Sequence, residues 1–279
     1  MTHFESTLQA SDGLQLYAQG WQPDGGPHGV VCLVHGLGEH SGRYAHLAAA
    51  LNQAGYALLA FDLRGHGKSQ GKRGHTPSYD ALMNDIAVFL AEVEKRYPGI
   101  PLFLYGHSLG GNLVLNYALR RSPGLAGVVA TAPSLKLAFE PPAIQVALGR
   151  GMDKIWPAFV QPNGLEIQAL SRDPEVARKY QADPLVHDRI SARLFVGFFE
   201  AGQWALDHAS RFPLPLLLMH GSADRLTSHE ASREFAARVG DEATLEIWDG
   251  LYHEIHNEPE QAQVFDTLIV WLDGQVANE

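Results

Sequence analysis

A serine between two glycines is the first residue of this sequence that could do covalent chemistry. Gly106-His107-Ser108-Leu109-Gly110 follows the apolar run Leu102–Tyr105 and precedes a segment with apolar residues at helical spacing. Strand, tight turn and helix in this order form a nucleophile elbow, which exposes the serine hydroxyl above the end of the strand. A serine hydroxyl is a poor nucleophile at neutral pH and needs a nearby base. If Ser108 attacks a substrate, the chain must therefore also supply a histidine and an acid.

Two later residues have the types and positions that such a serine requires. Asp224 follows the apolar run Pro215–Met219, and His253 follows the run Leu245–Trp248. Each is expected on a loop at the carboxyl end of a strand. A histidine there can accept the serine proton, and an aspartate can orient the histidine and stabilise its charged form. The sequence therefore predicts a catalytic triad of Ser108, Asp224 and His253, in the chain order typical of α/β-hydrolases.

Other residues compete for these roles. Asp249 is a rival acid, but it stands on the same short loop as His253 and is better suited to making the turn. His256 and His229 are rival bases in worse positions, because His256 lies closer to the last helix and His229 opens a helix. A second Gly-x-Ser-x-Gly match covers residues 67–71. It has neither a strand before it nor a helix after it, so we interpret it as a loop.

Acyl transfer also requires hydrogen-bond donors for the negative oxygen of the tetrahedral intermediate. Two backbone N–H groups are the expected supply. One belongs to Leu109, directly after the serine. The other comes from the loop after the first parallel strand, where Leu37 is the best-placed residue. The sequence contains no cysteine–histidine cluster and no paired-histidine spacing, so we expect neither a metal nor a cofactor.

The elements that must position these residues alternate along most of the chain. Six β-prone runs are Val30–Val34, Tyr56–Phe61, Leu102–Tyr105, Gly127–Thr131, Leu214–Met219 and Thr244–Trp248. Helices are expected at about 44–53, from Thr76-Pro77 to Gly99, and at 109–121, 229–239 and 259–272. This alternation predicts an α/β fold with a mainly parallel, twisted sheet and helices on both of its faces. The first 22 residues predict a hairpin around Ser11-Asp12-Gly13.

One connection is much longer than the others. About 80 residues separate Thr131 from Leu214, whereas connections in such sheets are usually about 2–6 residues long. We interpret this insertion as a helical cap, or lid, over the carboxyl edge of the sheet, where ligands bind in open α/β folds. One cap helix is expected to open at Asp173-Pro174 and another to run from about Ser191 to Arg211. The expected division is a core of residues 1–133 and 213–279 and a cap of residues 134–212.

The amino-acid composition excludes several classes of protein. The chain of 279 residues is 46% apolar and 19% charged, which is typical of a globular protein and excludes a disordered one. Its formal charge of −10 makes nucleic acid an unsuitable partner. The single cysteine, Cys32, is expected to be buried and structural. The first residues show no signal-peptide pattern, and no run approaches about 18 apolar residues, so we expect a soluble, cytoplasmic protein.

Four motifs, taken together, resemble those of a known family. They are His35-Gly36-Leu37-Gly38-Glu39-His40-Ser41-Gly42-Arg43-Tyr44, Asp62-Leu63-Arg64-Gly65-His66-Gly67-Lys68-Ser69, Gly106-His107-Ser108-Leu109-Gly110-Gly111 and Tyr252-His253-Glu254-Ile255-His256-Asn257-Glu258. They resemble the motifs of monoacylglycerol lipases and related lysophospholipase-like serine hydrolases, which have the α/β-hydrolase fold. The resemblance covers nearly the whole chain, including the cap segments Ser171–Val176 and Asp183–His187.

The resemblance implies an enzyme that cleaves monoacylglycerols to fatty acid and glycerol through an acyl-enzyme. By position, Glu39, Arg43 and His256 match family residues that line the polar, glycerol-binding side of the pocket. The alternative for Glu39 and Arg43 is an exposed ion pair. The chain departs from the family in two places. Leu109 stands where animal members commonly have Met, and the cap contains no cysteine.

Several alternatives remain open at this stage. Within the enzyme class, a broader carboxylesterase or a lysophospholipase is the second choice. A ligand receptor without catalysis is disfavoured, because the Ser, Asp and His are all present in the expected order. The apolar segments 143–148 and 155–160 either make transient contact with a membrane or micelle surface or pack the cap onto the core. The first role predicts a cytoplasmic protein that associates peripherally with membranes.

Overall fold

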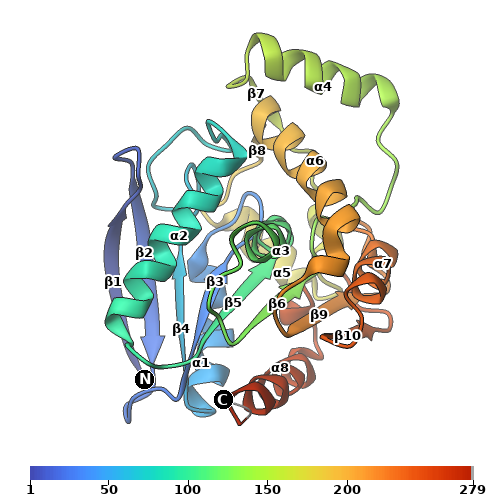
Figure 1. The fold of residues 1–279 in the computed structure, drawn as a ribbon. Helices are drawn as coiled ribbons and strands as arrows, with labels where there is room; N and C mark the ends of the chain where they lie inside the picture. The colour runs from blue at the N-terminus through green and yellow to red at the C-terminus, as the bar shows by residue number, and fades with distance from the viewer. Residues whose placement is uncertain (278–279) are drawn as a thin grey trace.

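The computed structural model describes residues 1–277, and a single large sheet runs through its centre (Figure 1). The strands are β1 (Thr2–Gln9), β2 (Gln15–Gln22), β3 (Gly29–Val34), β4 (Tyr56–Phe61), β5 (Leu102–His107), β6 (Gly127–Thr131), β7 (Val160–Pro162), β8 (Arg189–Ser191), β9 (Leu216–Gly221) and β10 (Ala243–Trp248). Eight of them form the sheet in the order β1-β2-β4-β3-β5-β6-β9-β10. Neighbouring strands from β4 to β10 in this order are parallel. β2 is antiparallel to both of its neighbours, β1 and β4. The predicted hairpin and mainly parallel sheet are confirmed.

The helices follow the strands as the sequence indicates. The α-helices are α1 (Ala45–Gln53), α2 (Tyr79–Arg96), α3 (Leu109–Arg121), α4 (Ala143–Ile155), α5 (Pro174–Ala182), α6 (Ala192–His208), α7 (His229–Val239) and α8 (Gln261–Val276). Short 3₁₀ helices are η1 (Ser41–Tyr44), η2 (Ile167–Ala169), η3 (Ala209–Arg211) and η4 (Ile255–Asn257). α2 begins two residues after Pro77, because the Ser78 hydroxyl accepts a hydrogen bond from the Ala81 amide at 3.0 Å and caps the helix there.

Side chains of the central strands alternate between two buried faces. In β3, Val30, Cys32 and Val34 pack in the cluster that contains the apolar faces of α2, α3, α6 and α7. Val31 and Leu33 point to the opposite face and pack with α1 and α8. All six residues of β3 are buried, as expected for a parallel strand covered on both sides. Cys32 is fully buried, which confirms the prediction made from its neighbours.

The long connection between β6 and β9 forms the expected helices and one more. Asp173 and Ser191 cap α5 and α6 with their side chains, where the sequence predicts helix starts. α4 was not predicted, because Gly149 and Gly151 in its interior weaken the helical pattern. Figure 1 shows α4 projecting beyond α6, far from the sheet. The division of the chain into residues 1–133, 134–212 and 213–279 stays a prediction.

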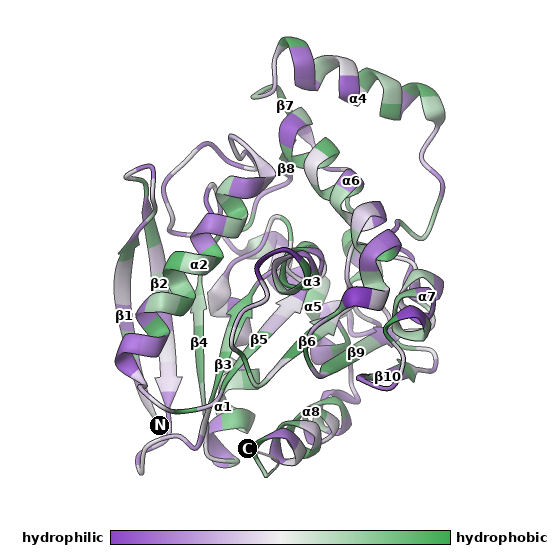
Figure 2. Cartoon of the chain, viewed as in Figure 1, coloured by the Kyte–Doolittle hydropathy of each residue, from purple (hydrophilic) through white to green (hydrophobic). Residues whose placement is uncertain are grey.

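The outer helix of this connection has little of its surface covered. No residue of α4 is buried, and hydrophobic and hydrophilic residues are interleaved along it (Figure 2). Among residues 1–277, no helix combines the length and the apolar character needed to cross a bilayer.

Candidate active site

Ser108 occupies the sharp turn between β5 and α3. Its backbone is in an unusual conformation, with φ 53° and ψ −113°. A Cβ at Gly106 would lie 2.3 Å from the Gly110 carbonyl oxygen, and one at Gly110 would lie 1.9 Å from that of Val34. Only glycine therefore fits on either side of the serine. Ser108 stands at the N-cap of α3, yet its hydroxyl caps nothing, so it stays available for other chemistry.

Asp224 and His253 meet at the carboxyl ends of neighbouring strands. Asp224 follows β9 and His253 follows β10, and both side chains are buried. His253 Nδ1 lies 2.7 Å from Asp224 Oδ2. The other carboxylate oxygen, Oδ1, accepts hydrogen bonds from the amides of Leu226 at 2.7 Å and Thr227 at 3.1 Å. The carboxylate is thus held in one orientation toward the imidazole.

The surroundings of this pair favour a charged acid and a strongly basic histidine. Burial acts to raise the pKa of Asp224, but His253 and a second histidine, His220, hold that pKa well below its usual range. Burial acts to lower the pKa of His253, but the charge and hydrogen bond of Asp224 outweigh it and raise that pKa above 6.5. Glu254 and Glu39 add to this increase. The pair therefore has the electrostatics of a general base and its orienting acid.

Ser108 and His253 line the same cavity, of about 540 Å³. The Ser108 hydroxyl oxygen lies 3.4 Å from that of Ser134. No hydrogen bond joins Ser108 to His253 in the described part of the chain. Catalytic hydrogen bonds are often long or misaligned in the absence of substrate.

Two backbone amides beside Ser108 are without a partner. Leu37 and Leu109 both line the cavity, and within residues 1–277 neither N–H donates a hydrogen bond. The neighbouring Gly36 amide is occupied, because it donates to Glu39 Oε1 at 2.7 Å. Leu37 and Leu109 are therefore left as the donors that an oxyanion at Ser108 could use.

The rival residues lie in other surroundings. Asp249 accepts a hydrogen bond from Ser222 at 3.1 Å within its turn, and His229 is the first residue of α7. In the second Gly-x-Ser-x-Gly match, Ser69 is buried in a loop and donates to the Asp62 carbonyl oxygen at 2.5 Å. The interpretation of that match as a loop is confirmed.

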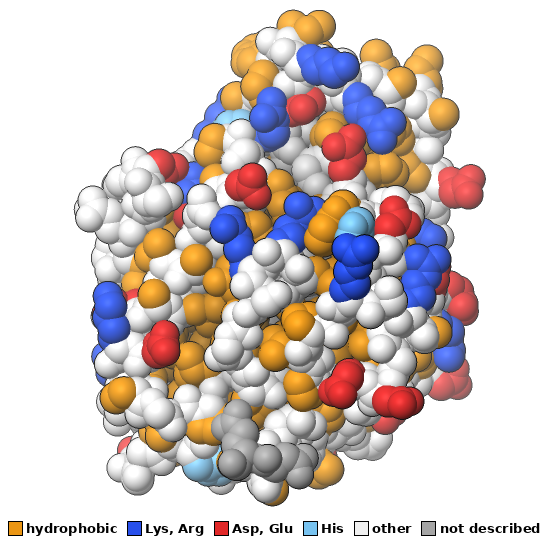
Figure 3. All heavy atoms as spheres, in the orientation of Figure 1, with side chains coloured by type: hydrophobic (Ala, Val, Ile, Leu, Met, Phe, Trp, Pro, Cys, Tyr) orange, Lys and Arg blue, Asp and Glu red, His pale blue; other side chains and the backbone are white. Residues whose placement is uncertain are grey.

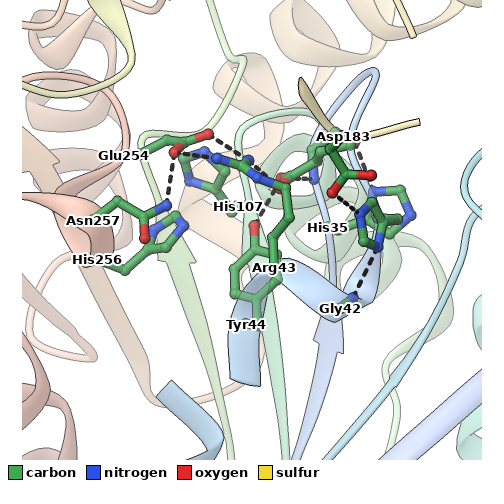
Figure 4. A network of polar contacts seen from close by, with 12 residues as sticks. His35, Gly42, Arg43, Tyr44, His107, Asp183, Glu254, His256 and Asn257 are labelled. Atoms are coloured by element: carbon green, nitrogen blue, oxygen red, sulfur yellow. Dashed lines mark hydrogen bonds and ion pairs between the residues drawn. The ribbon is translucent and has the colours of Figure 1, made fainter. Parts of the chain in front are cut away.

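One arginine connects two acidic residues beside this cavity (Figure 4). Arg43 donates to Glu39 at 2.7 Å and binds both oxygens of Glu254 at 2.7 and 2.8 Å. Glu39 also accepts a hydrogen bond from the Tyr44 hydroxyl at 2.8 Å. Glu39 and Glu254 are each only 2% exposed. The alternative of an exposed ion pair is therefore wrong, because the network is enclosed by protein.

The three residues matched to a glycerol pocket lie at different depths. Glu39 lines the cavity, but Arg43 and His256 are not among its lining residues. His256 is fully buried, with its ring stacked on Tyr44 at 4.9 Å and edge-on to His107 at 4.7 Å. Neither of its ring nitrogens has a hydrogen-bond partner among residues 1–277. Arg43 and His256 thus stand behind the wall that Glu39 helps to form.

Two polar residues of this cavity were missed from the sequence. Asn163 Nδ2 and the Tyr180 hydroxyl are buried, line the cavity and have no partner among the described residues. A Cβ at Gly38 would lie 3.1 Å from the Tyr180 hydroxyl and 3.5 Å from Asn163 Nδ2, so both lie beside the Leu37 loop. Tyr180 precedes the Asp183–His187 motif by three residues, which was the only available signal. Asn163 stands in no motif.

The rest of the cavity wall is largely apolar and comes mostly from the long connection between β6 and β9. Its apolar side chains include Leu148, Met152, Phe159, Phe195 and Phe198, and the loop after β9 adds Leu226. Among residues 1–277, no group of three or more His, Cys, Asp or Glu side chains could hold a metal ion. The cavity therefore joins an apolar compartment, a serine with a base and free amides, and a small polar compartment. This arrangement suits acyl transfer from an ester with an apolar acyl chain and a polar alcohol.

Known proteins resemble this chain in sequence and in architecture. A family model described as serine aminopeptidase, S33, matches residues 25–260. The chain belongs to this S33 family of serine hydrolases. Among its S33 relatives, the monoacylglycerol lipase of Mycolicibacterium smegmatis is 35% identical over 97% of both chains. The monoglyceride lipase of Homo sapiens is 33% identical over 97% of this chain and 90% of its own.

A solved structure also resembles the whole chain. The crystal structure of Paleococcus ferrophilus monoacylglycerol lipase matches this S33 member with a TM-score of 0.84 and 37% identity, covering 100% of each chain. The fold is the α/β-hydrolase fold. The chain also aligns over its full length with an uncharacterized abhydrolase domain-containing protein of Dictyostelium discoideum, of which it spans 30%.

Proposed function

We propose that the protein hydrolyses monoacylglycerols to fatty acid and glycerol. The observation that carries this proposal is the position of Ser108 between the apolar cap wall and the polar compartment of Glu39, Asn163 and Tyr180. An acyl chain fits the first compartment and glycerol hydroxyls fit the second. The relatives named as monoacylglycerol and monoglyceride lipases support the same substrate class.

The reaction begins with attack of Ser108 Oγ on the ester carbonyl carbon. His253 takes the serine proton at Nε2, while Asp224 holds the Nδ1–H and stabilises the imidazolium. The amides of Leu37 and Leu109 donate to the negative oxygen of the tetrahedral intermediate. His253 then gives its proton to the glycerol oxygen, and the acyl-enzyme remains.

Water completes the cycle by attacking the acyl-enzyme. His253 takes a proton from this water, the same two amides stabilise the second intermediate, and Ser108 leaves with the proton returned by His253. Fatty acid is released from the apolar compartment.

The charges of the polar compartment favour glycerol over a phosphate-containing head group. Glu39 and Glu254 line the cavity, and one arginine, Arg43, pairs with both. Two carboxylates and one guanidinium leave a net negative charge there, which repels phosphate. We therefore expect monoacylglycerols to be better substrates than lysophospholipids, although Phospholipase YtpA of Bacillus subtilis is 28% identical over 92% of this chain and 99% of its own.

The outer surface of the cap supports contact with a lipid surface, at which a cytoplasmic enzyme would meet its substrate. Ile144, Ile155 and Trp156 are between 56% and 83% exposed. Figure 3 shows hydrophobic side chains at the outer edge of the projecting part of the molecule that carries α4, with charged side chains among them. Such side chains can enter the boundary between head groups and acyl chains. The net charge of −10 gives no attraction to anionic lipid.

The test compares fatty-acid release from a monoacylglycerol, a diacylglycerol, a lysophosphatidylcholine and a short p-nitrophenyl ester. We expect the monoacylglycerol to be preferred and Ser108→Ala to lower its turnover at least about a thousandfold. Ser69→Ala, in the second Gly-x-Ser-x-Gly match, is the matched control and should keep the activity. Turnover of the short ester alone would contradict the substrate, and an active Ser108→Ala protein would contradict the mechanism.

A further inference from the structure

A second imidazole binds the carboxylate of the triad. His220, the fifth residue of β9, is fully buried, and its Nε2 lies 3.0 Å from Asp224 Oδ2. His253 Nδ1 lies 2.7 Å from the same oxygen. The other nitrogen of His220, Nδ1, lies 2.8 Å from the hydroxyl of Ser232 on α7. His220 is thus held by hydrogen bonds between Asp224 and Ser232 of α7.

These contacts fix the protonation state of His220. An ionised carboxylate only accepts hydrogen bonds, so His220 Nε2 must carry a hydrogen. Burial lowers the pKa of His220, and the ring is therefore neutral with a bare Nδ1 at pH 7. The Ser232 hydroxyl then donates to Nδ1. His220 consequently donates a hydrogen bond to Asp224 without adding a positive charge.

Hydrogen-bond donors occupy the acceptor sites of the Asp224 carboxylate. A carboxylate has about four lone-pair sites. The amides of Leu226 and Thr227 take two of them on Oδ1, and His253 and His220 take two on Oδ2. The Thr227 hydroxyl oxygen lies 2.8 Å from Oδ2 and 3.0 Å from the Ala132 carbonyl oxygen, so its one hydrogen can be donated to either acceptor. The charge on Oδ2 is therefore divided between two imidazoles.

We propose that His220 is a positioning residue of the triad. Its Nε2–H anchors Asp224 Oδ2 and takes part of the charge that would otherwise act on His253 alone, which limits the proton affinity of His253. This inference rests on the proposed function, because it assigns His253 the role of general base. It predicts that loss of the His220 donor makes His253 more basic and less well oriented.

Other groups around the two histidines stay in place when residue 220 is changed. His253 is faced by Asp224, by His107 with ring centroids 4.8 Å apart, and by Glu254 and Glu39. His220 is faced by Asp224, Ser232 and Thr227, and by His229 with ring centroids 6.3 Å apart. Among these groups, Asp224 is the charged one that lies within hydrogen-bond distance of both rings, and the uncharged Thr227 hydroxyl lies 3.3 Å from a nitrogen of each.

The experiment uses three substitutions that separate the donor from the shape of the side chain. His220→Gln keeps an N–H near the position of Nε2, His220→Asn keeps a polar atom near Nδ1 only, and His220→Phe keeps the ring without nitrogen. The pH dependence of kcat/KM is measured on a soluble p-nitrophenyl ester, and the titration of His253 is followed by NMR. For Phe and Asn we expect kcat to fall about tenfold and the acid midpoint to rise by about half a pH unit. Gln should stay close to wild type in both.

Two results would overturn the inference: an unchanged acid midpoint in all variants, or a Gln variant that behaves like Asn. If the Phe variant does not fold, the comparison of Gln with Asn decides the question alone. Failure of the proposed function is recognised separately, since it appears as turnover of the short ester alone or as activity in Ser108→Ala. The NMR titration of His253 reports on the shared carboxylate without any turnover.

Discussion

At the scale of residues, a single guanidinium holds two acidic side chains beneath the cavity. Arg43 is the only cation that bonds Glu39 and Glu254 within residues 1–277, and both carboxylates are almost inaccessible to water. The arginine also lies against the Tyr180 ring, with its Cζ 4.8 Å from the ring centroid. Removing one partner of a buried ion network leaves charge without compensation, which is more costly than the net value of the pairs.

Arg43→Met should therefore destabilise the protein strongly. We expect the free energy of unfolding to fall by about 3–5 kcal/mol, because two buried carboxylates lose their counter-charge. Arg43→Lys keeps the charge but not the paired donors and should fall between Met and wild type. Urea unfolding of the three proteins measures the difference. Equal midpoints for Met and wild type would show that water, not Arg43, compensates these acids.

The raised pKa of His253 predicts a pH profile. His253 must be neutral to act as a base, so kcat/KM falls as the pH drops through its pKa. Because Asp224 keeps that pKa above 6.5, we expect the acid midpoint to lie above 6.5. Asp224→Asn removes the charge and should move the midpoint lower while reducing the rate. A wild-type midpoint below 6.5 would contradict the assigned pair.

The positions of Ser108, Asp224 and His253 could be predicted from the sequence because each follows a strand of clear apolar character. The depth of Arg43 and His256 could not, since the same spacing fits an exposed loop or a buried layer. His220 and Asn163 were missed for a related reason. His220 lies only four residues before Asp224, but the local sequence does not show that their side chains meet. Asn163 Nδ2 has no hydrogen-bond partner among the described residues, so no pattern marks it.

At the scale of elements, the best-predicted helices are those with a capping residue and one apolar face. α7, capped by Ser228, has the predicted bounds, and α2, capped by Ser78, differs only at its ends. α3 also has the predicted bounds although the Ser108 side chain does not cap it, because the tight turn of the nucleophile elbow fixes its start. α4 has neither feature: its N-cap, Pro142, makes no side-chain hydrogen bond, and none of its residues is buried. Its position depends on contact with α6, which no local pattern shows.

The exposed apolar side chains of α4 should bind lipid. Ile144→Ser combined with Ile155→Ser should lower the bound fraction on phosphatidylcholine vesicles, with the partition coefficient falling at least about tenfold. The two residues are 70% and 83% exposed and do not line the cavity. Vesicle sedimentation measures the effect. Val270→Ser, on α8 and also 70% exposed, is the matched control; equal loss in both proteins would rule out a specific role for α4.

At the scale of the whole molecule, neutral histidines are built into the interior. Burial lowers the pKa of His35 and holds the pKa values of His66, His107 and His256 well below 6.5. It also lowers the pKa of His187 to about 4. In the unfolded chain these groups take up protons near pH 6.5, before the folded protein does. Acid therefore favours unfolding well above the range in which carboxylates titrate.

Stability should decline as the pH falls from 7 to 5. Each histidine with a depressed folded pKa contributes up to about 1.4 kcal/mol per pH unit below 6.5, because only the unfolded state is protonated there. His253 acts in the opposite direction, since its folded pKa is raised. His256→Phe keeps a ring against Tyr44. It should reduce the change in the free energy of unfolding with pH by the contribution of one histidine. Urea unfolding at several pH values measures this, and an unchanged slope would show that His256 is protonated in the folded state.

The ends of the long connection lie next to each other, because β6 and β9 are adjacent strands. The Ala132 amide, where the chain leaves β6, donates to the Met219 carbonyl oxygen of β9 at 2.9 Å. A segment whose two ends meet in this way can be replaced during evolution as one cassette. Changes confined to it alter the apolar wall of the cavity and leave the backbone of Ser108, Asp224 and His253 in the sheet loops. New preferences for the acyl chain can therefore arise on this scaffold while Ser108, Asp224 and His253 stay in place.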